Sequence, residues 1–125
     1  MDEKIYPGAM YSGKRVSECG GQPVFKQILP DGELVELSPT LSQTLCNHSP
    51  DGFQWGYGGS GPAQLALALL FDATSDPKTA LTYHQDFKWA FVAGWKAEWS
   101  ILQSEILLWI EQQKKARLEA MISQN

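Results

Sequence analysis

A helix that is apolar on nearly every side has to be buried, and residues 62–72 of this chain form such a helix by their pattern. Ala and Leu alternate or repeat through most of the segment. Ser60 or Gly61 is expected at the N-cap, with Pro62 at the first helical position, where the missing N–H of proline costs nothing. We therefore predict that 62–72 is the central helix of the domain.

Two more helices are predicted towards the C-terminus. Asp76 followed by Pro77 repeats the cap-then-proline pattern and begins a helix over 77–93, which Gly94 ends. A third helix is predicted over 104–120. Beyond Glu111 its apolar density falls, so this part either frays or forms a dimer or partner contact through its remaining apolar residues, Leu118, Met121 and Ile122.

The N-terminal part, residues 4–37, is predicted to be rich in β-structure. Residues 4–6 form a short candidate strand, and the apolar runs 23–29 and 34–37 flank Pro30-Asp31-Gly32-Glu33. Proline presets the first turn angle and glycine accepts a positive φ, so these runs form a hairpin. Residues 99–102 are a further extended candidate, and 40–46 fit either a strand or a helical turn.

Together these elements predict an α+β fold, in which a small N-terminal antiparallel sheet packs on about three helices. The sheet needs such a layer because an isolated hairpin is marginal in water. With 125 residues, 43% of them hydrophobic, the chain can build one core but hardly two, so residues 1–125 are expected to be a single domain. Its parts are a β-rich segment (4–37), a glycine and aromatic loop (38–61) and a helical segment (62–125).

Composition excludes several classes of function. A net charge of −4 argues against broad nucleic-acid binding, which needs a basic surface. The longest apolar run, 65–71, is too short to span a membrane, and the first residues lack a secretory signal pattern. We therefore expect a cytoplasmic protein with Cys19 and Cys46 reduced.

The loop from Asn47 to Gly61 contains Gly56-Tyr57-Gly58-Gly59-Ser60-Gly61, which formally fits GxGxxG and opens a helix. Glycines allow a ligand to approach the backbone, and free N–H groups at a helix start favour an anion. The dinucleotide fingerprint also needs a βαβ unit and an acidic residue at a strand end. Asp76 lies near that spacing but is placed as a helix cap. The segment is therefore either a tight corner or a corner that also cradles a ligand.

His48 is the one titratable imidazole in the loop, and the only other histidine is His84. His48 fits a general base, an anion contact, a metal ligand or a hydrogen bond to the loop backbone. No set of residues stands at zinc-ligand spacing, so no metal site and no cofactor is predicted. Ser60 fits an N-cap better than a nucleophile, because the GxSxG elbow is absent.

The loop aromatics Phe53, Trp55 and Tyr57 alternate, so they are expected either to face one side as a contact surface or to form a small satellite core. The charged residues Asp86, Lys88 and Lys96 are expected to be solvated. The candidate binding residues are therefore in the loop and at the start of the helix: His48, Phe53, Trp55, Tyr57, Gly58, Gly59, Ser60 and Gly61.

The run from Asn47 to Ala66 resembles the signature NHSPxGFxWGYGGSGPAQLALA of a family of uncharacterised proteins from bacteria, haloarchaea, phages and plasmids. The later elements Tyr83–Lys88, Trp99 and Trp109-Ile110 also resemble that family, with His84 as one extra residue, and the resemblance covers about residues 45–110. It implies a role in the biology of phages or other mobile elements, but no activity.

These observations predict a non-enzymatic binding protein that contacts a partner protein or a small phosphate-bearing ligand through the loop at residues 47–61. The alternative is a small hydrolase or transferase that acts on a phosphorylated substrate, with His48 as general base and Ser60, Asp51 or Cys46 nearby. A third possibility is a scaffold that oligomerises through the C-terminal helix.

Overall fold

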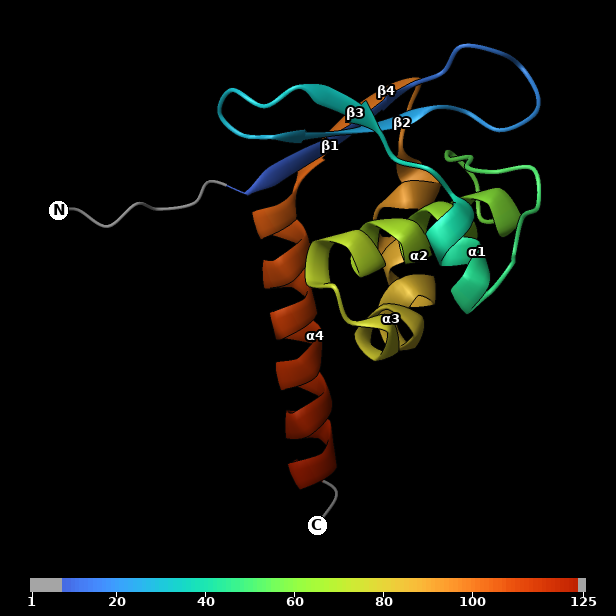
Figure 1. Ribbon diagram of the computed structural model, residues 1–125. Coiled ribbons are helices and arrows are strands. Elements are labelled where there is room, and N and C mark those ends of the chain that lie inside the picture. Colours follow the sequence, from blue (N-terminus) through green and yellow to red (C-terminus); the bar gives the residue numbers. More distant parts are fainter. Residues whose placement is uncertain (1–7, 124–125) are drawn as a thin grey trace, which may run out of the picture.

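The computed structural model describes residues 8–123 and has an α+β fold with two layers (Figure 1). Strands β1 (Ala9–Lys14), β2 (Val24–Ile28), β3 (Leu34–Glu36) and β4 (Glu98–Leu102) form one antiparallel sheet in the order β3-β2-β1-β4. The helices lie on one face of this sheet, as Figure 1 shows. The predicted fold class is therefore confirmed.

The helical layer consists of α1 (Thr40–Leu45), α2 (Ser60–Thr74), α3 (Pro77–Ala90) and α4 (Gln103–Ser123), with a short 3₁₀ turn, η1 (Val92–Gly94), after α3. Helix α2 is the centre of the domain, because almost all of its side chains are buried. This confirms the prediction from its apolar pattern. Within residues 8–123, no helix is long and apolar enough to cross a membrane.

The sheet differs from the prediction in two respects. Strand β4, expected only as an isolated extended run, pairs with β1, so the sheet is not wholly N-terminal. Strand β1 was not predicted, because Ser12 and Gly13 interrupt an alternation that otherwise buries Ala9 and Tyr11 against the helices. The β2–β3 hairpin is confirmed. The candidate strand 4–6 lies outside the described residues.

The helix boundaries also differ. Gly59, with φ −96° and ψ −161°, is the N-cap of α2, so Ser60 is the first helical residue and not the cap. Helix α3 ends at Ala90, before the predicted residue 93, and Gly94 ends the short turn η1 that follows Phe91. Helix α4 continues to Ser123, and its last turns project away from the body with exposed side chains (Figure 1).

The N-cap of α3 gives a prediction about pH. Asp76 is the N-cap, as the sequence predicted: its side chain accepts hydrogen bonds from the backbone N–H groups of Lys78 and Thr79 and from the Thr79 hydroxyl. These bonds, first those from Thr79, hold the pKa of Asp76 below its usual 3.8. A lowered carboxyl pKa stabilises the fold above the unfolded-state value and this stabilisation is lost as the pH falls through the folded-state value.

We therefore expect Asp76→Asn, which keeps a capping oxygen, to melt below the wild type at pH 7, and this difference to disappear as the pH falls below 3.8. Asp76→Ala, which has no capping group, is expected to melt below wild type at every pH. Thermal unfolding followed by circular dichroism from pH 2 to 7 measures both differences. A constant difference for the asparagine variant over that range would contradict this account.

Candidate functional site

The loop between α1 and α2 is attached to the domain by Gln64, a fully buried polar residue of α2. Its Oε1 accepts hydrogen bonds from the backbone N–H groups of His48 (2.8 Å) and Ser49 (3.0 Å). Its Nε2 donates to the Ser42 hydroxyl (2.9 Å) and to the Cys46 carbonyl (3.1 Å). One side chain of the central helix thus fixes the end of α1 and the start of the loop.

Two of the three loop aromatics are core residues. Trp55 has no exposed surface, donates from Nε1 to the Lys96 carbonyl (2.8 Å) and meets the Trp99 ring edge-on at 5.5 Å. Phe53 is buried in the same core. The expectation that these aromatics form one contact surface is therefore corrected: Phe53 and Trp55 are not accessible to a partner, whereas Tyr57 is 52% exposed.

The middle of the loop is also held by Arg15, which follows β1. Its guanidinium donates to the Gln54 side-chain oxygen (3.0 Å) and to the Trp55 carbonyl (3.0 Å), and it lies over the Trp55 ring. Gly56 donates from its backbone N–H to the Val92 carbonyl (3.0 Å) and has a φ of +93°, which favours glycine. The chain therefore turns sharply after Trp55.

The glycines at the tip of the loop lie against two exposed aromatic rings. A β-carbon on Gly58 would lie 2.6 Å from Cζ3 of Trp89 and closer still to its Cη2, and one on Gly59 would lie 2.5 Å from Cε2 of Tyr57. Trp89, on α3, is 65% exposed. We call the surface formed by Tyr57, Gly58 and Trp89 the aromatic platform.

Lys88 contacts two members of this platform, Gly58 and Trp89. Lys88 is only 7% exposed, so the prediction that it is solvated is wrong. Nζ donates to the Gly58 carbonyl (3.1 Å) and lies 4.5 Å from the centre of the Trp89 ring. A cation over an aromatic face is attracted by the ring quadrupole. The other two charges, Asp86 and Lys96, are exposed as predicted.

A cavity of about 410 Å³ lies beside the platform, at the start of α2. Its lining includes three of the predicted residues, Tyr57, Ser60 and Gly61, but not His48. The rest of the lining is Gly20, Gly21, Ser49, Asp51, Gly52 and Gln54. None of the lining residues is basic and one is acidic, so the cavity offers no cationic side chain to an anion.

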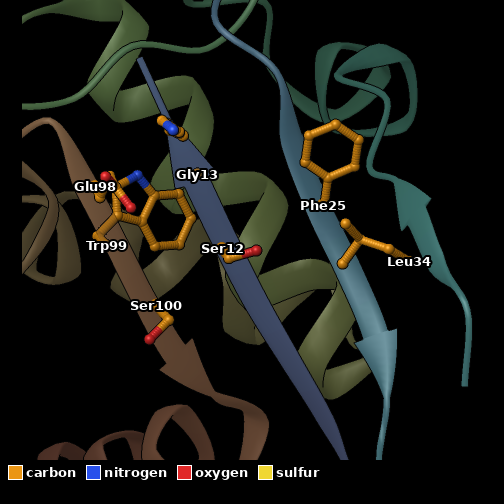
Figure 2. A pocket seen from close by; sticks show the side chains of 8 residues that line it. Ser12, Gly13, Phe25, Leu34, Glu98, Trp99 and Ser100 are labelled. Carbon is orange, nitrogen blue, oxygen red and sulfur yellow. The ribbon is translucent and has the colours of Figure 1, made fainter. Parts of the chain in front are cut away.

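A larger cavity, about 680 Å³, lies away from the loop on the sheet (Figure 2). Its lining residues come from every strand of the sheet. Figure 2 shows Leu34 on β3, Phe25 on β2 and Ser12 on β1 among them. Its charged lining residues, Lys14 and Glu98, are cross-strand partners whose charges offset each other. Sequence reasoning missed this cavity because its residues come from all four strands and share no motif.

The structure brings together the only two histidines of the chain. Nε2 of His48 lies 2.9 Å from Nε2 of His84, and the Cys46 sulfur lies 4.0 Å from Nδ1 of His48. His84 is buried, and this burial lowers its pKa, with a further contribution from the nearby charges of His48 and Lys88. The sequence placed Cys46 near His48 in the enzyme alternative but indicated no contact with His84. Within residues 8–123, no three or more His, Cys, Asp or Glu side chains are arranged so that they could hold a metal ion together.

The chain thus forms a small α+β domain in which a glycine-rich turn leads directly into the central helix. A profile of a family of unknown function (DUF6166) matches residues 11–112, and the chain belongs to this family. This confirms the predicted membership of an uncharacterised family. No match to a curated protein or to a solved structure was found.

Proposed function

We propose that the protein is a non-enzymatic binding protein that contacts a partner protein through the aromatic platform. The observation that carries the proposal is the placement of Trp89 and Tyr57, two large rings that remain 65% and 52% exposed while the loop glycines and Lys88 pack against them. Trp and Tyr are the residues that most often dominate binding energy at protein interfaces. A ring that is already fixed loses little conformational entropy when a partner covers it.

The other ligand considered, a small phosphate-bearing molecule, is less well supported. The cavity at the start of α2 is lined by Asp51, and a carboxylate opposes a phosphate. Two cations that contact the loop already have partners there, since Arg15 binds the loop backbone at Trp55 and Lys88 binds the Gly58 carbonyl. An interface with a protein needs no cation at this position, so a partner protein is the better match.

The alternative function, a hydrolase or transferase with His48 as general base, is supported by one observation. Cys46, His48 and His84 follow one another at contact distance, as a nucleophile, a base and an orienting group would. However, Ser60 and Asp51 line the cavity beside the platform without His48. Release of phosphate from p-nitrophenyl phosphate that is lost in His48→Ala would favour this alternative.

Two further parts of the proposal concern the cellular compartment and the biological role of the protein. We place the protein in the cytoplasm because Cys19 and Cys46 are both free thiols, which suits a reducing compartment. The role in phage or plasmid biology remains an expectation from the resemblance.

The platform is tested by capture and reconstitution. A protein retained by immobilised wild type is purified, and its affinity for wild type, Trp89→Ala and Tyr57→Ala is measured by calorimetry. Each variant is expected to bind about tenfold more weakly or worse, with a melting temperature close to that of wild type, because both rings are mostly in solvent. Leu108→Ala is the matched control, since Leu108 is 60% exposed on α4. Equal affinity of all four proteins would refute the proposal.

A further inference from the structure

The contact between His48 and His84 joins a loop to a helix across 36 positions of sequence. Their ring centres are 5.0 Å apart and the rings are tilted by 38°, so the two Nε2 atoms are the nearest parts of the imidazoles. The ring of His84 and the backbone of His48 are each held by their own segment. His84 is buried on α3, and the backbone N–H of His48 is bound by Gln64. The pair is therefore held in place before any ligand arrives.

The outer partner of His84 determines where its proton lies. Nδ1 of His84 is 2.9 Å from the Leu81 carbonyl, which can only accept a hydrogen bond, so Nδ1 carries the hydrogen. In the neutral ring, Nε2 of His84 is then an unprotonated lone pair directed at His48.

His48 can match this arrangement in two ways. With its proton on Nε2, it donates to His84, and Nδ1 accepts from the Cys46 thiol. With its proton on Nδ1, the Cys46 sulfur is the acceptor and the two Nε2 lone pairs face each other. The second arrangement is repulsive unless both lone pairs bind one cation that lies to the side of the line joining the two nitrogens. The pair is thus arranged to share either a proton or a metal ion.

We propose that His48 and His84 bind a divalent transition-metal ion, of the kind that imidazole prefers (zinc, copper or nickel), through their two Nε2 atoms, with water as the remaining ligands. Bonds of 2.0–2.1 Å at a right angle separate two nitrogens by about 2.9 Å, and a tetrahedral angle separates them by about 3.4 Å. The observed 2.9 Å lies at the lower end of this range.

The outer nitrogen of His84 also has the hydrogen-bond partner that a metal-bound histidine needs. Metal-bound histidines usually donate their other ring N–H to a carbonyl or carboxylate, and the Nδ1 of His84 has the Leu81 carbonyl in that position. On binding, the proton of His48 moves from Nε2 to Nδ1, so the neutral pair takes up the ion without losing a proton. This site does not depend on the aromatic platform, whose binding test leaves both histidines intact.

The site is tested by titrating the full chain with Zn²⁺, Ni²⁺ and Cu²⁺ at pH 7.5, with Mg²⁺ as the negative control. Calorimetry is expected to show one ion per wild-type chain, and Cu²⁺ electron paramagnetic resonance is expected to show coupling to two nitrogen nuclei. His48→Gln and His84→Gln are each expected to lose most of the affinity, whereas Cys19→Ser, which removes the exposed thiol, binds as wild type does.

Failure of the wild type to bind, or unchanged binding in both histidine variants, would overturn the proposal. The resonance spectrum provides a test that needs no variant. Copper bound to wild type without coupling to two nitrogens would place the ion elsewhere and would also refute the site.

Discussion

Replacement of Trp55 by alanine is expected to lower the free energy of unfolding by about 3–5 kcal/mol, the usual cost of removing a large aromatic side chain from a core. Trp55 is fully buried, and the alanine variant would lose the edge-on contact with Trp99 and the cation contact with Arg15. It would also leave the Lys96 carbonyl without its hydrogen bond. This cost is a large fraction of the stability of a small domain.

Equilibrium unfolding in urea, followed by far-ultraviolet circular dichroism, measures this loss. The matched control is Trp89→Ala, which removes the same side chain from a site that is 65% exposed and is expected to cost less than about 1 kcal/mol. If the two variants lost similar free energy, the assignment of one ring to the core and the other to the surface would be wrong.

Replacement of Gln64 by leucine is expected to destabilise the domain by about 3 kcal/mol, although it adds an apolar side chain to an apolar helix. The backbone N–H groups of His48 and Ser49 would lose their shared acceptor, and each unsatisfied buried group costs about 1–3 kcal/mol. The Ser42 hydroxyl and the Cys46 carbonyl would lose their donor as well.

Gln43→Leu is the matched control, because the Gln43 side chain makes one hydrogen bond, to the Ser49 carbonyl, and is only partly buried. It is expected to cost about 1 kcal/mol. Hydrogen exchange gives a second measure, since the amides of His48 and Ser49 are expected to lose protection in Gln64→Leu and to keep it in the control. Equal losses in the two variants would show that Gln64 does not attach the loop.

Sequence patterns predicted those helices and strands whose formation depends on residues close together in the chain. The apolar residues of 62–72 predicted burial on all sides, and Asp76-Pro77 predicted a helix start, because both depend on neighbours within a few positions. The β2–β3 hairpin followed from its turn residues. The pairing of β4 with β1 was not predictable in this way, since it joins segments almost ninety residues apart and leaves no local signal.

The location of the candidate site could be predicted from the sequence, but the residues that form it could not. The loop glycines indicated close approach of another group, and the structure shows that this group is Trp89, a residue of α3 that no loop motif contains. Alternation suggested a common face for Phe53, Trp55 and Tyr57, but the turn at Gly56 separates Tyr57 from the two buried rings. Lys88 was placed in solvent because its partner, the Gly58 carbonyl, belongs to a distant segment.

The central claim is that the loop positions the exposed rings of Tyr57 and Trp89 for contact with a partner protein. The variant Gly58→Ala tests this claim most directly. Gly58 does not have a positive φ, so alanine suits the backbone, but the added methyl group would displace the ring of Trp89. The measurement is the affinity of this variant for the partner protein identified with wild type. We predict a melting temperature near that of wild type and a loss of affinity like that of Trp89→Ala. Wild-type affinity in Gly58→Ala, with the ring displaced, would contradict the account.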